Sequence, residues 1–351
     1  MKKRKLLLSG GGTGGSVTPL LAIVEQARLK KLSYEFFWAG TAHGPERHMV
    51  ENYGIIFFIL PAGKWRRYWD WRNVAAPFLV AAGFLKSIWL LQKLHPDAVL
   101  TAGGFVSVPL VWASWCLRIP VTVHEQDVER GLANKLMSPF ASLKTSVWPG
   151  HDKNSVVIGN LVRPSVLNGN PLAARRHFQT GSDLSLVLVM GGGTGALALN
   201  RLIIEALPFL AERVLLIHLT GAGKQISVQP SIYYHQQAFA RAELPDFYAA
   251  AEVVVSRAGM GTISELACLG KAAIVIPIPD SHQEANAQAI AQRGAAIVLE
   301  QINLTANKFA QEVLNLVNNQ AIREHYGRAL HELIADGSKQ FLEHLETIFI
   351  N

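Results

Sequence analysis

The sequence predicts an α/β protein of two Rossmann-like, doubly wound domains that face each other across a cleft. The chain has 351 residues, of which 50% are hydrophobic and 17% are charged, which suits two domains with large cores. Short apolar runs alternate with helical segments, the pattern of a parallel sheet. Two glycine turns, Gly10–Gly15 and Gly191–Gly195, each follow such a run and each open one half of the chain.

The first half is expected to begin with a buried strand at Lys5–Leu8. Pro19 follows the first glycine turn at a position where helices commonly begin, and residues 20–32 continue as a helix. The basic N-terminus precedes only Leu6–Leu8, which is too short an apolar stretch for a signal peptide. Further strands are predicted at Tyr34–Ala39, Ile55–Leu60, Ala98–Thr101 and Val121–His124.

The second half repeats this plan. We expect an N-terminal domain of residues 1–160 and a C-terminal domain of residues 161–337. A final helix, Ser338–Ile348, is expected to pack back on the first domain within residues 338–351. Strands are predicted at Leu186–Met190, Val214–Leu219, Val253–Ser256 and Ala273–Pro277, with a helix over residues 196–210 after the second glycine turn.

Composition limits the location and the partners. No uninterrupted run of about 18 apolar residues is present, so we expect no segment that spans a bilayer. Cys116 and Cys268 lack metal-ligand spacing, which suits a reducing, cytoplasmic compartment. The net charge of +7 favours an anionic partner such as a nucleic acid, a lipid surface or a phosphorylated ligand.

Both glycine turns match the dinucleotide fingerprint. Glycine lets backbone N–H groups approach a phosphate, and the start of the following helix adds partial positive charge. A nicotinamide site also needs an acidic residue at the end of the next strand. The chain has Ala39–Thr41 and Leu219–Gly221 there, without an acid, which argues against a dehydrogenase and favours another phosphate-bearing ligand. The fingerprint residues are Gly10, Gly12 and Gly15, and Gly191, Gly193 and Ala196.

Two polar motifs in the second half indicate a ligand site. Residues 256–265 read SRAGMGTISE, follow a strand and open a helix, so their backbone amides suit an anion. Glu265 is expected in the first turn of that helix, where it either stabilises the helix dipole or accepts hydrogen bonds from two ribose hydroxyls. His282, Gln283 and Asn286 lie three or four residues apart on one helix face, which favours ligand binding over a simple cap.

Residues 64–72 read KWRRYWDWR and precede the apolar stretch Phe78–Leu91. Interleaved aromatic and basic side chains suit the headgroup region of an anionic membrane, so a surface that lies on the bilayer is predicted. The alternatives are a helix packed on the sheet and a single-stranded nucleic acid site, but no nucleic-acid-binding module accompanies the segment. The predicted membrane residues are Trp65, Arg66, Arg67, Tyr68, Trp69, Trp71, Phe84 and Trp89.

In this order, the motifs resemble the MurG family of peptidoglycan glycosyltransferases over nearly the whole chain. The resemblance implies a GT-B fold and an inverting transfer that needs no metal or other cofactor. N-acetylglucosamine would pass from UDP-N-acetylglucosamine to lipid I, the undecaprenyl-pyrophosphoryl-N-acetylmuramoyl-pentapeptide, at the cytoplasmic face of the cell membrane. The resemblance leaves other cell-wall synthesis proteins open as partners. It rests on the two glycine turns, the two polar motifs, Gly103–Ser107, His124–Gln126, Gly131–Lys135 and Gly159–Arg163.

The resemblance also implies site residues. Arg163 and the second glycine turn would hold the donor phosphates, Glu265 the ribose, and Gln283 with Asn286 the sugar. The acceptor pyrophosphate would lie at Gly12, Gly14, Gly15, Gly103 and Gly104. The donor set comprises Thr13, Gly14, Gly15, Asp127, Arg163, Gly191, Gly192, Gly193, Thr194, Gly195, Phe239, Ala240 and Leu244 (these last three beside the uracil), Gly259, Met260, Gly261, Thr262, Glu265, His282, Gln283 and Asn286.

An inverting transfer needs a base to take the proton of the acceptor hydroxyl. The family usually has a histidine directly after the first glycine turn, whereas this chain has Ser16, which has no useful proton affinity near neutral pH. Glu125, Ser16 and His124 are therefore the catalytic candidates, and Glu125 is preferred. Asp127 and Gly193–Thr194 also depart from the family pattern.

Three alternatives stay open at this point. One is a related UDP-sugar transferase that acts on another lipid acceptor. Another is a catalytically impaired scaffold that only binds a sugar nucleotide, for which Ser16 is the support. The non-hydrolysing sugar-nucleotide epimerases share the two-domain architecture, but they give no reason for the aromatic and basic segment.

Overall fold

The computed structural model describes residues 3–63, 72–150, 152–178, 184–192, 196–229, 231–240 and 242–349 of the chain. The chain divides into two compact units. Unit 1 comprises Met1–Arg163 and Asp336–Asn351, and unit 2 comprises Pro164–Ala335. The expected limits at residues 160 and 337 lie close to these.

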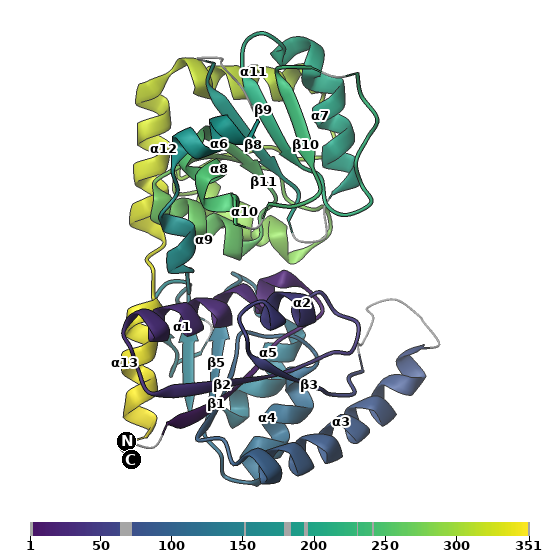
Figure 1. Ribbon diagram of the computed structural model, residues 1–351, viewed down its shortest axis with the longest axis vertical. Coiled ribbons are helices and arrows are strands. Elements are labelled where there is room, and N and C mark those ends of the chain that lie inside the picture. The colour runs from purple at the N-terminus through teal and green to yellow at the C-terminus, as the bar shows by residue number, and fades with distance from the viewer. Residues whose placement is uncertain are drawn as a thin grey trace. The chain divides into compact units, whose positions relative to one another are not determined.

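Unit 1 contains a seven-stranded parallel sheet with the order β3-β2-β1-β4-β5-β6-β7. Its central strands read as continuous apolar runs because helices cover both faces of the sheet (Figure 1). The strands are β1 (Arg4–Ser9), β2 (Tyr34–Gly40), β3 (Ile56–Ile59), β4 (Ala98–Thr101), β5 (Val121–Glu125), β6 (Leu143–Ser146) and β7 (Val156–Val157).

The helices of unit 1 lie in two layers. One core forms between the sheet and helices α1 and α13, and the other between the sheet and helices α3 and α4. The described helices are η1 (Gly14–Ser16), α1 (Thr18–Leu29), α2 (Glu46–Glu51), α3 (Arg72–Leu94), α4 (Ser107–Cys116), α5 (Leu132–Met137), η2 (Ser138–Phe140) and α13 (Ser338–Ile348).

Unit 2 contains a six-stranded parallel sheet with the order β10-β9-β8-β11-β12-β13, and α7 and α11 bury its main core. The strands are β8 (Leu186–Met190), β9 (Leu215–Leu219), β10 (Tyr234–Gln237), β11 (Ala251–Ser256), β12 (Ala272–Val275) and β13 (Ile297–Val298). The helices are η3 (Pro164–Leu167), α6 (Pro171–His177), α7 (Leu197–Leu210), α8 (Leu244–Ala250), α9 (Met260–Leu269), α10 (His282–Ala291), α11 (Ala306–Asn318) and α12 (Gln320–Leu333).

The strand order places both glycine turns at equivalent positions. In unit 1 the order reverses between β1 and β4, and in unit 2 it reverses between β8 and β11. Ligands of doubly wound sheets bind at such switch points, beyond the carboxyl ends of the strands. Each glycine turn directly follows the strand at its switch point, so the predicted fold class of two Rossmann-like units is confirmed.

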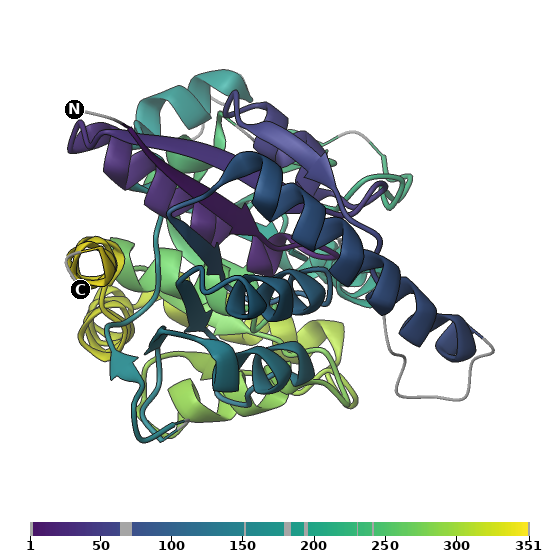
Figure 2. The ribbon, with the colours of Figure 1, turned by 90° about the horizontal axis from the view of Figure 1, so that it is seen from below.

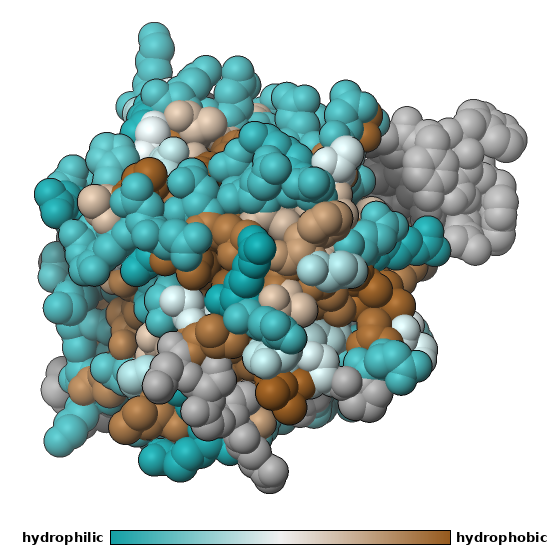
Figure 3. Space-filling view, turned by 90° about the horizontal axis from the view of Figure 1, so that it is seen from above, coloured by the Kyte–Doolittle hydropathy of each residue, from teal (hydrophilic) through white to brown (hydrophobic). Residues whose placement is uncertain are grey.

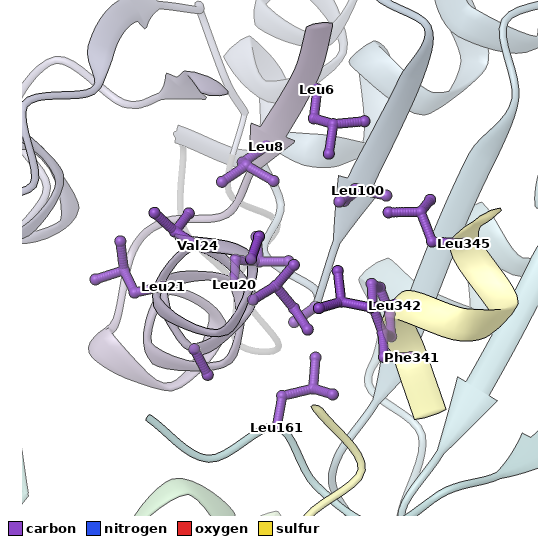
Figure 4. Close-up of a cluster of buried hydrophobic side chains, with 14 of the residues drawn as sticks. Leu6, Leu8, Leu20, Leu21, Val24, Leu100, Leu161, Phe341, Leu342 and Leu345 are labelled. Carbon is purple, nitrogen blue, oxygen red and sulfur yellow. The ribbon is translucent and has the colours of Figure 1, made fainter. Parts of the chain in front are cut away.

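The C-terminal helix α13 belongs to the core of unit 1. Figure 4 shows Phe341, Leu342 and Leu345 of α13 directed toward Leu20 of α1 and Leu100 of β4, in a cluster that is almost completely buried. Polar contacts add to this attachment, because Arg4 and Tyr34 both donate hydrogen bonds to the Glu346 carboxylate.

Replacing Phe341 by alanine is expected to lower the free energy of unfolding by about 3–5 kcal/mol, since the change leaves a cavity in a closed core. Urea denaturation followed by circular dichroism measures this loss. The matched control is Leu29→Ala on α1, where the side chain is 66% exposed and the expected change is within about 0.5 kcal/mol. A loss below about 1 kcal/mol at Phe341 would mean that α13 is not part of the core of unit 1.

Helix α3 is unusual in this unit because much of its apolar surface is exposed. Its N-terminal turns extend beyond the neighbouring helices of the unit (Figures 1 and 2). Within the described residues, Ala76–Leu94 is the single helical stretch long and apolar enough to cross a membrane, judged by length and composition alone, and most of it is not buried. Lys86 and Lys93 interrupt the stretch, in keeping with the absence of an unbroken apolar run in the sequence.

Candidate active site

The carboxyl ends of β1 and β4 bring two glycine turns of unit 1 together. Gly12, Gly103 and Gly104 have φ values of +86°, +106° and +96°, a backbone region that favours glycine. A Cβ atom at Gly104 would lie 3.0 Å from the backbone nitrogen and oxygen of Gly11. The predicted acceptor turns are therefore in contact, and any side chain at Gly104 would separate them.

Ser16 is buried in the first glycine turn. Its hydroxyl donates to the backbone oxygens of Gly11 and Thr13, each at 3.4 Å. The hydroxyl therefore stabilises the backbone of the turn, and in this geometry Ser16 has a supporting role rather than that of a base.

Glu125 ends β5 and is 7% exposed. The Asn134 side chain of α5 donates to its Oε2 atom at 2.8 Å. Burial raises the pKa of Glu125 to about 7; the Asn134 hydrogen bond lowers it, and the Asp127 carboxylate adds to the increase. A carboxyl with a pKa near 7 can accept a proton at neutral pH, as a general base must.

His124 occupies a closed environment on the other side of the same strand. Its Nδ1 atom lies 2.9 Å from the Thr145 hydroxyl and its Nε2 atom 3.1 Å from Asn160 Oδ1, and the ring packs edge-on against Phe341. Burial lowers the pKa of His124 to about 4. Since both ring nitrogens are engaged inside the fold, we assign His124 a structural role.

Gln126 connects β5 to the first glycine turn, which the sequence did not indicate. Its Nε2 atom donates to Gly15 O at 2.9 Å. The half-buried Asp127 follows directly.

Arg163 ends the first segment of unit 1 and lies beside Tyr53. Burial and Glu25 raise the pKa of the Tyr53 hydroxyl, and the positive charge of Arg163 opposes this increase.

In unit 2, Glu265 lies on α9 and is 7% exposed. The buried Tyr248 of α8 donates its hydroxyl to Glu265 Oε2 at 2.9 Å. The prediction that Glu265 lies in the first turn of its helix is wrong, because α9 begins at Met260 and its first turn contains no acidic residue. A helix-dipole role therefore does not account for this carboxylate.

The side chains of the second polar motif differ in burial and in hydrogen-bond partners. Asn286 is fully buried and donates to Ala258 O at 3.1 Å, whereas His282 at the start of α10 is exposed. The Gln283 side chain accepts from Ile278 N at 3.2 Å. Asn286 therefore connects α10 to the loop before α9, and ligand binding by the motif stays a prediction.

Arg257 lies next to Ala258 in the loop after β11 and adds a second connection. Its guanidinium is buried and donates to Ile276 O at 3.0 Å, to Pro277 O at 3.1 Å and to the Gln301 side chain. The loops that follow β11 and β12 are thus held together by the Arg257 side chain, and Asn286 of α10 adds a contact to the first of them. They form the carboxyl edge of the sheet, where Gly259, Met260, Gly261 and Thr262 open α9.

The other predicted residues differ in their exposure and in the elements on which they lie. Gly191 and Gly192 follow β8, and Gly192 has a φ of +81°. Phe239 is exposed after β10, Ala240 is half-buried, and Leu244 begins α8. On α3, Phe84 packs against the core and Trp89 is 54% exposed. The predicted residues Trp65, Arg66, Arg67, Tyr68, Trp69, Trp71, Gly193, Thr194 and Gly195 lie outside the described part of the chain.

Comparison with known proteins identifies the family of this chain. Residues 6–144 match the glycosyltransferase family 28 N-terminal domain, and residues 186–341 match the glycosyltransferase family 28 C-terminal domain. A protein of Lachnoclostridium phytofermentans is 35% identical over 330 residues, which is 90% of this chain and 92% of that protein. Its name is UDP-N-acetylglucosamine–N-acetylmuramyl-(pentapeptide) pyrophosphoryl-undecaprenol N-acetylglucosamine transferase. The chain belongs to the MurG family.

Further relatives support the same family. A Bacillus cereus protein with the same name, numbered 3, is 36% identical over 90% of this chain and 91% of its own length. The crystal structure of Acinetobacter baumannii MurG matches with a TM-score of 0.73 and 24% identity, over 98% of this chain and 99% of that one. This match shows the GT-B fold of the MurG family. Within that fold, Ser16 remains a departure from the histidine usual in the family.

Proposed function

We propose that this chain is an inverting glycosyltransferase that moves N-acetylglucosamine from UDP-N-acetylglucosamine to lipid I, giving lipid II. The observation that carries the proposal is the 35% identity, over nine-tenths of the chain, to a transferase named for this reaction. Two buried carboxylates support it further. Glu125 of unit 1 is suited to accept a proton, and Glu265 of unit 2, which accepts a hydrogen bond from Tyr248, is suited to bind the ribose.

The proposed step is a direct displacement at the anomeric carbon of the donor sugar. The acceptor hydroxyl attacks this carbon, the bond from the carbon to the diphosphate breaks, and UDP leaves with the bonding electrons. The Glu125 carboxylate takes the proton of the hydroxyl as the new bond forms. Glu265 binds the ribose hydroxyls, for which its two oxygens are suited, and Tyr248 fixes its orientation.

Transfer of labelled N-acetylglucosamine to lipid I, with Ser16→His assayed alongside, tests this function. We expect product from the native protein, which would show that no histidine is needed at position 16. Product from Ser16→His alone would contradict an active native enzyme and favour a scaffold. If neither protein forms product while UDP-N-acetylglucosamine still binds, transfer to lipid I is contradicted, and other lipid acceptors are assayed next.

We propose further that α3 places unit 1 on an anionic membrane surface. Phe78, Leu85 and Trp89 are 76%, 68% and 54% exposed on this helix. Lys86 lies between them, and the Lys93 ammonium lies 4.9 Å from the centre of the Trp89 ring. Rings and alkyl chains that enter the headgroup region, with cations beside them, bind a bilayer without crossing it.

Exposure of single apolar side chains is not sufficient for this proposal. On the face drawn in Figure 3, hydrophobic side chains form patches that hydrophilic ones border, as is normal for protein surfaces. Helix α3 differs because its exposed apolar residues follow one another along a helix that also carries lysines.

Replacing Phe78, Leu85 and Trp89 together by serine is expected to weaken binding to phosphatidylglycerol vesicles by at least about tenfold, because apolar burial is lost. Vesicle flotation measures this binding. A matched control replaces Leu172, Ile232 and Ile302 of unit 2, which are 62%, 71% and 76% exposed, and should bind vesicles as the native protein does. Equal loss in both triple variants would contradict a specific role of α3.

A further inference from the structure

Glu46 is a fully buried carboxylate beside the first glycine turn. It begins α2, and its oxygens accept hydrogen bonds from Gly12 N at 3.1 Å, from Thr41 N at 2.9 Å and from the Thr41 hydroxyl. Among the residues that the structure describes, no cationic side chain lies within ion-pair distance of Glu46. Two backbone N–H groups and one threonine hydroxyl therefore replace the hydration of this carboxylate.

The surrounding backbone is shaped to this carboxylate. A Cβ atom at Gly11 or at Gly44 would overlap the Glu46 carboxyl group. From the sequence, we expected the glycines of the turn to bind the phosphate of a ligand. In the structure, the Glu46 carboxylate fills the space beside Gly11 and accepts the hydrogen bond of the Gly12 amide.

This arrangement divides the first glycine turn into two halves. The inward half, at Gly11 and Gly12, faces Glu46, and a phosphate there would meet a like charge in a site of low dielectric. The outward half, Thr13–Ser16, forms η1 with its cap and is held at Gly15 by Gln126, the neighbour of Glu125. The turn is therefore fixed at two points, at Gly12 before the half that remains for a ligand and at Gly15 within it.

We propose that Glu46 is a positioning residue for the acceptor: it excludes phosphate from Gly12 and holds Thr13–Ser16 in the geometry that receives the acceptor pyrophosphate. This inference rests on the proposed function. It removes Gly12 from the predicted pyrophosphate ligands and assigns its amide to Glu46.

Two variants disturb this contact in different ways. Glu46→Gln keeps the size of the side chain but removes its charge, and Gly44→Ala displaces the carboxylate without removing the charge. The control is Glu51→Gln on the same helix, where the side chain is about half exposed and paired with Arg47. Hydrogen–deuterium exchange of a peptide covering residues 10–18, thermal unfolding, and kinetics with each substrate varied in turn are measured for all three.

Both variants are expected to lose amide protection in residues 10–18 and to lower kcat/KM for lipid I by about tenfold to a hundredfold, the effect of losing a hydrogen bond to a charged group. The KM for UDP-N-acetylglucosamine should stay within about twofold of the native value, and Glu51→Gln should behave as the native protein does. Unchanged protection of the turn would overturn the inference. So would equal losses for both substrates that follow the loss of folded protein, because these indicate a purely structural role. If the native protein forms no product, the proposed function fails, and the exchange measurement alone decides whether Glu46 holds the turn.

Discussion

Replacing Glu125 by glutamine is expected to lower kcat by about 10²- to 10⁴-fold, the usual contribution of a general base. Glutamine keeps the size of the side chain and can still bond to Asn134, so the fold should be unchanged. Initial rates of transfer to lipid I measure the effect, and calorimetric titration with UDP-N-acetylglucosamine should give a native affinity. A fall in kcat of less than about tenfold would mean that another group takes the proton.

The pH dependence of the native enzyme gives an independent test of this role. The base must be ionised, and burial raises the pKa of Glu125 to about 7. We therefore expect kcat/KM for lipid I to rise with pH and to level off above about 7, and this rise should be absent in Glu125→Gln. Because the Asn134 hydrogen bond lowers the pKa of Glu125, Asn134→Ala should move the rise to higher pH. A rise that persists unchanged in Glu125→Gln would assign it to a different group.

Replacing Glu265 by alanine is expected to weaken binding of UDP-N-acetylglucosamine by about 10²-fold, which corresponds to the loss of a charge-assisted pair of hydrogen bonds to the ribose. Calorimetric titration measures this affinity. The matched control is Glu332→Ala, an exposed carboxylate on α12 that should bind the donor as the native protein does.

Comparison of UDP with 2′-deoxy-UDP localises the effect to the ribose. The native protein should prefer UDP, and Glu265→Ala should bind both equally because the acceptor of the hydroxyl is gone. Tyr248→Phe should reduce the preference by a smaller factor, since the carboxylate remains but loses the hydroxyl that orients it. A preference for UDP that survives in Glu265→Ala would show that another group binds the ribose.

The main elements of the fold could be predicted because their signals are local. Buried parallel strands read as short apolar runs, and the runs at Ala98–Thr101 and Leu186–Met190 became β4 and β8 with the predicted bounds. The strands β6 (LKTS) and β10 (YHQQ) were missed because polar side chains on them interrupt the apolar pattern. Pro19 and the glycine turns likewise marked the start of α1 by local chemistry.

The site was less predictable because the roles of its residues depend on partners that are distant in the chain. Motif order was sufficient to indicate the MurG family, which the comparisons confirm. The resemblance then implied roles for Glu125 and Glu265, and these roles stay predictions. The sequence could not show that Thr145 and Asn160 engage both nitrogens of His124, or that Asn286 is directed toward Ala258. Nor could it show that Glu46, 34 residues after Gly12, occupies the amide assigned to a phosphate. Burial and hydrogen bonding decide what a polar side chain does, and both are set only when strands far apart in the sequence come together in one sheet.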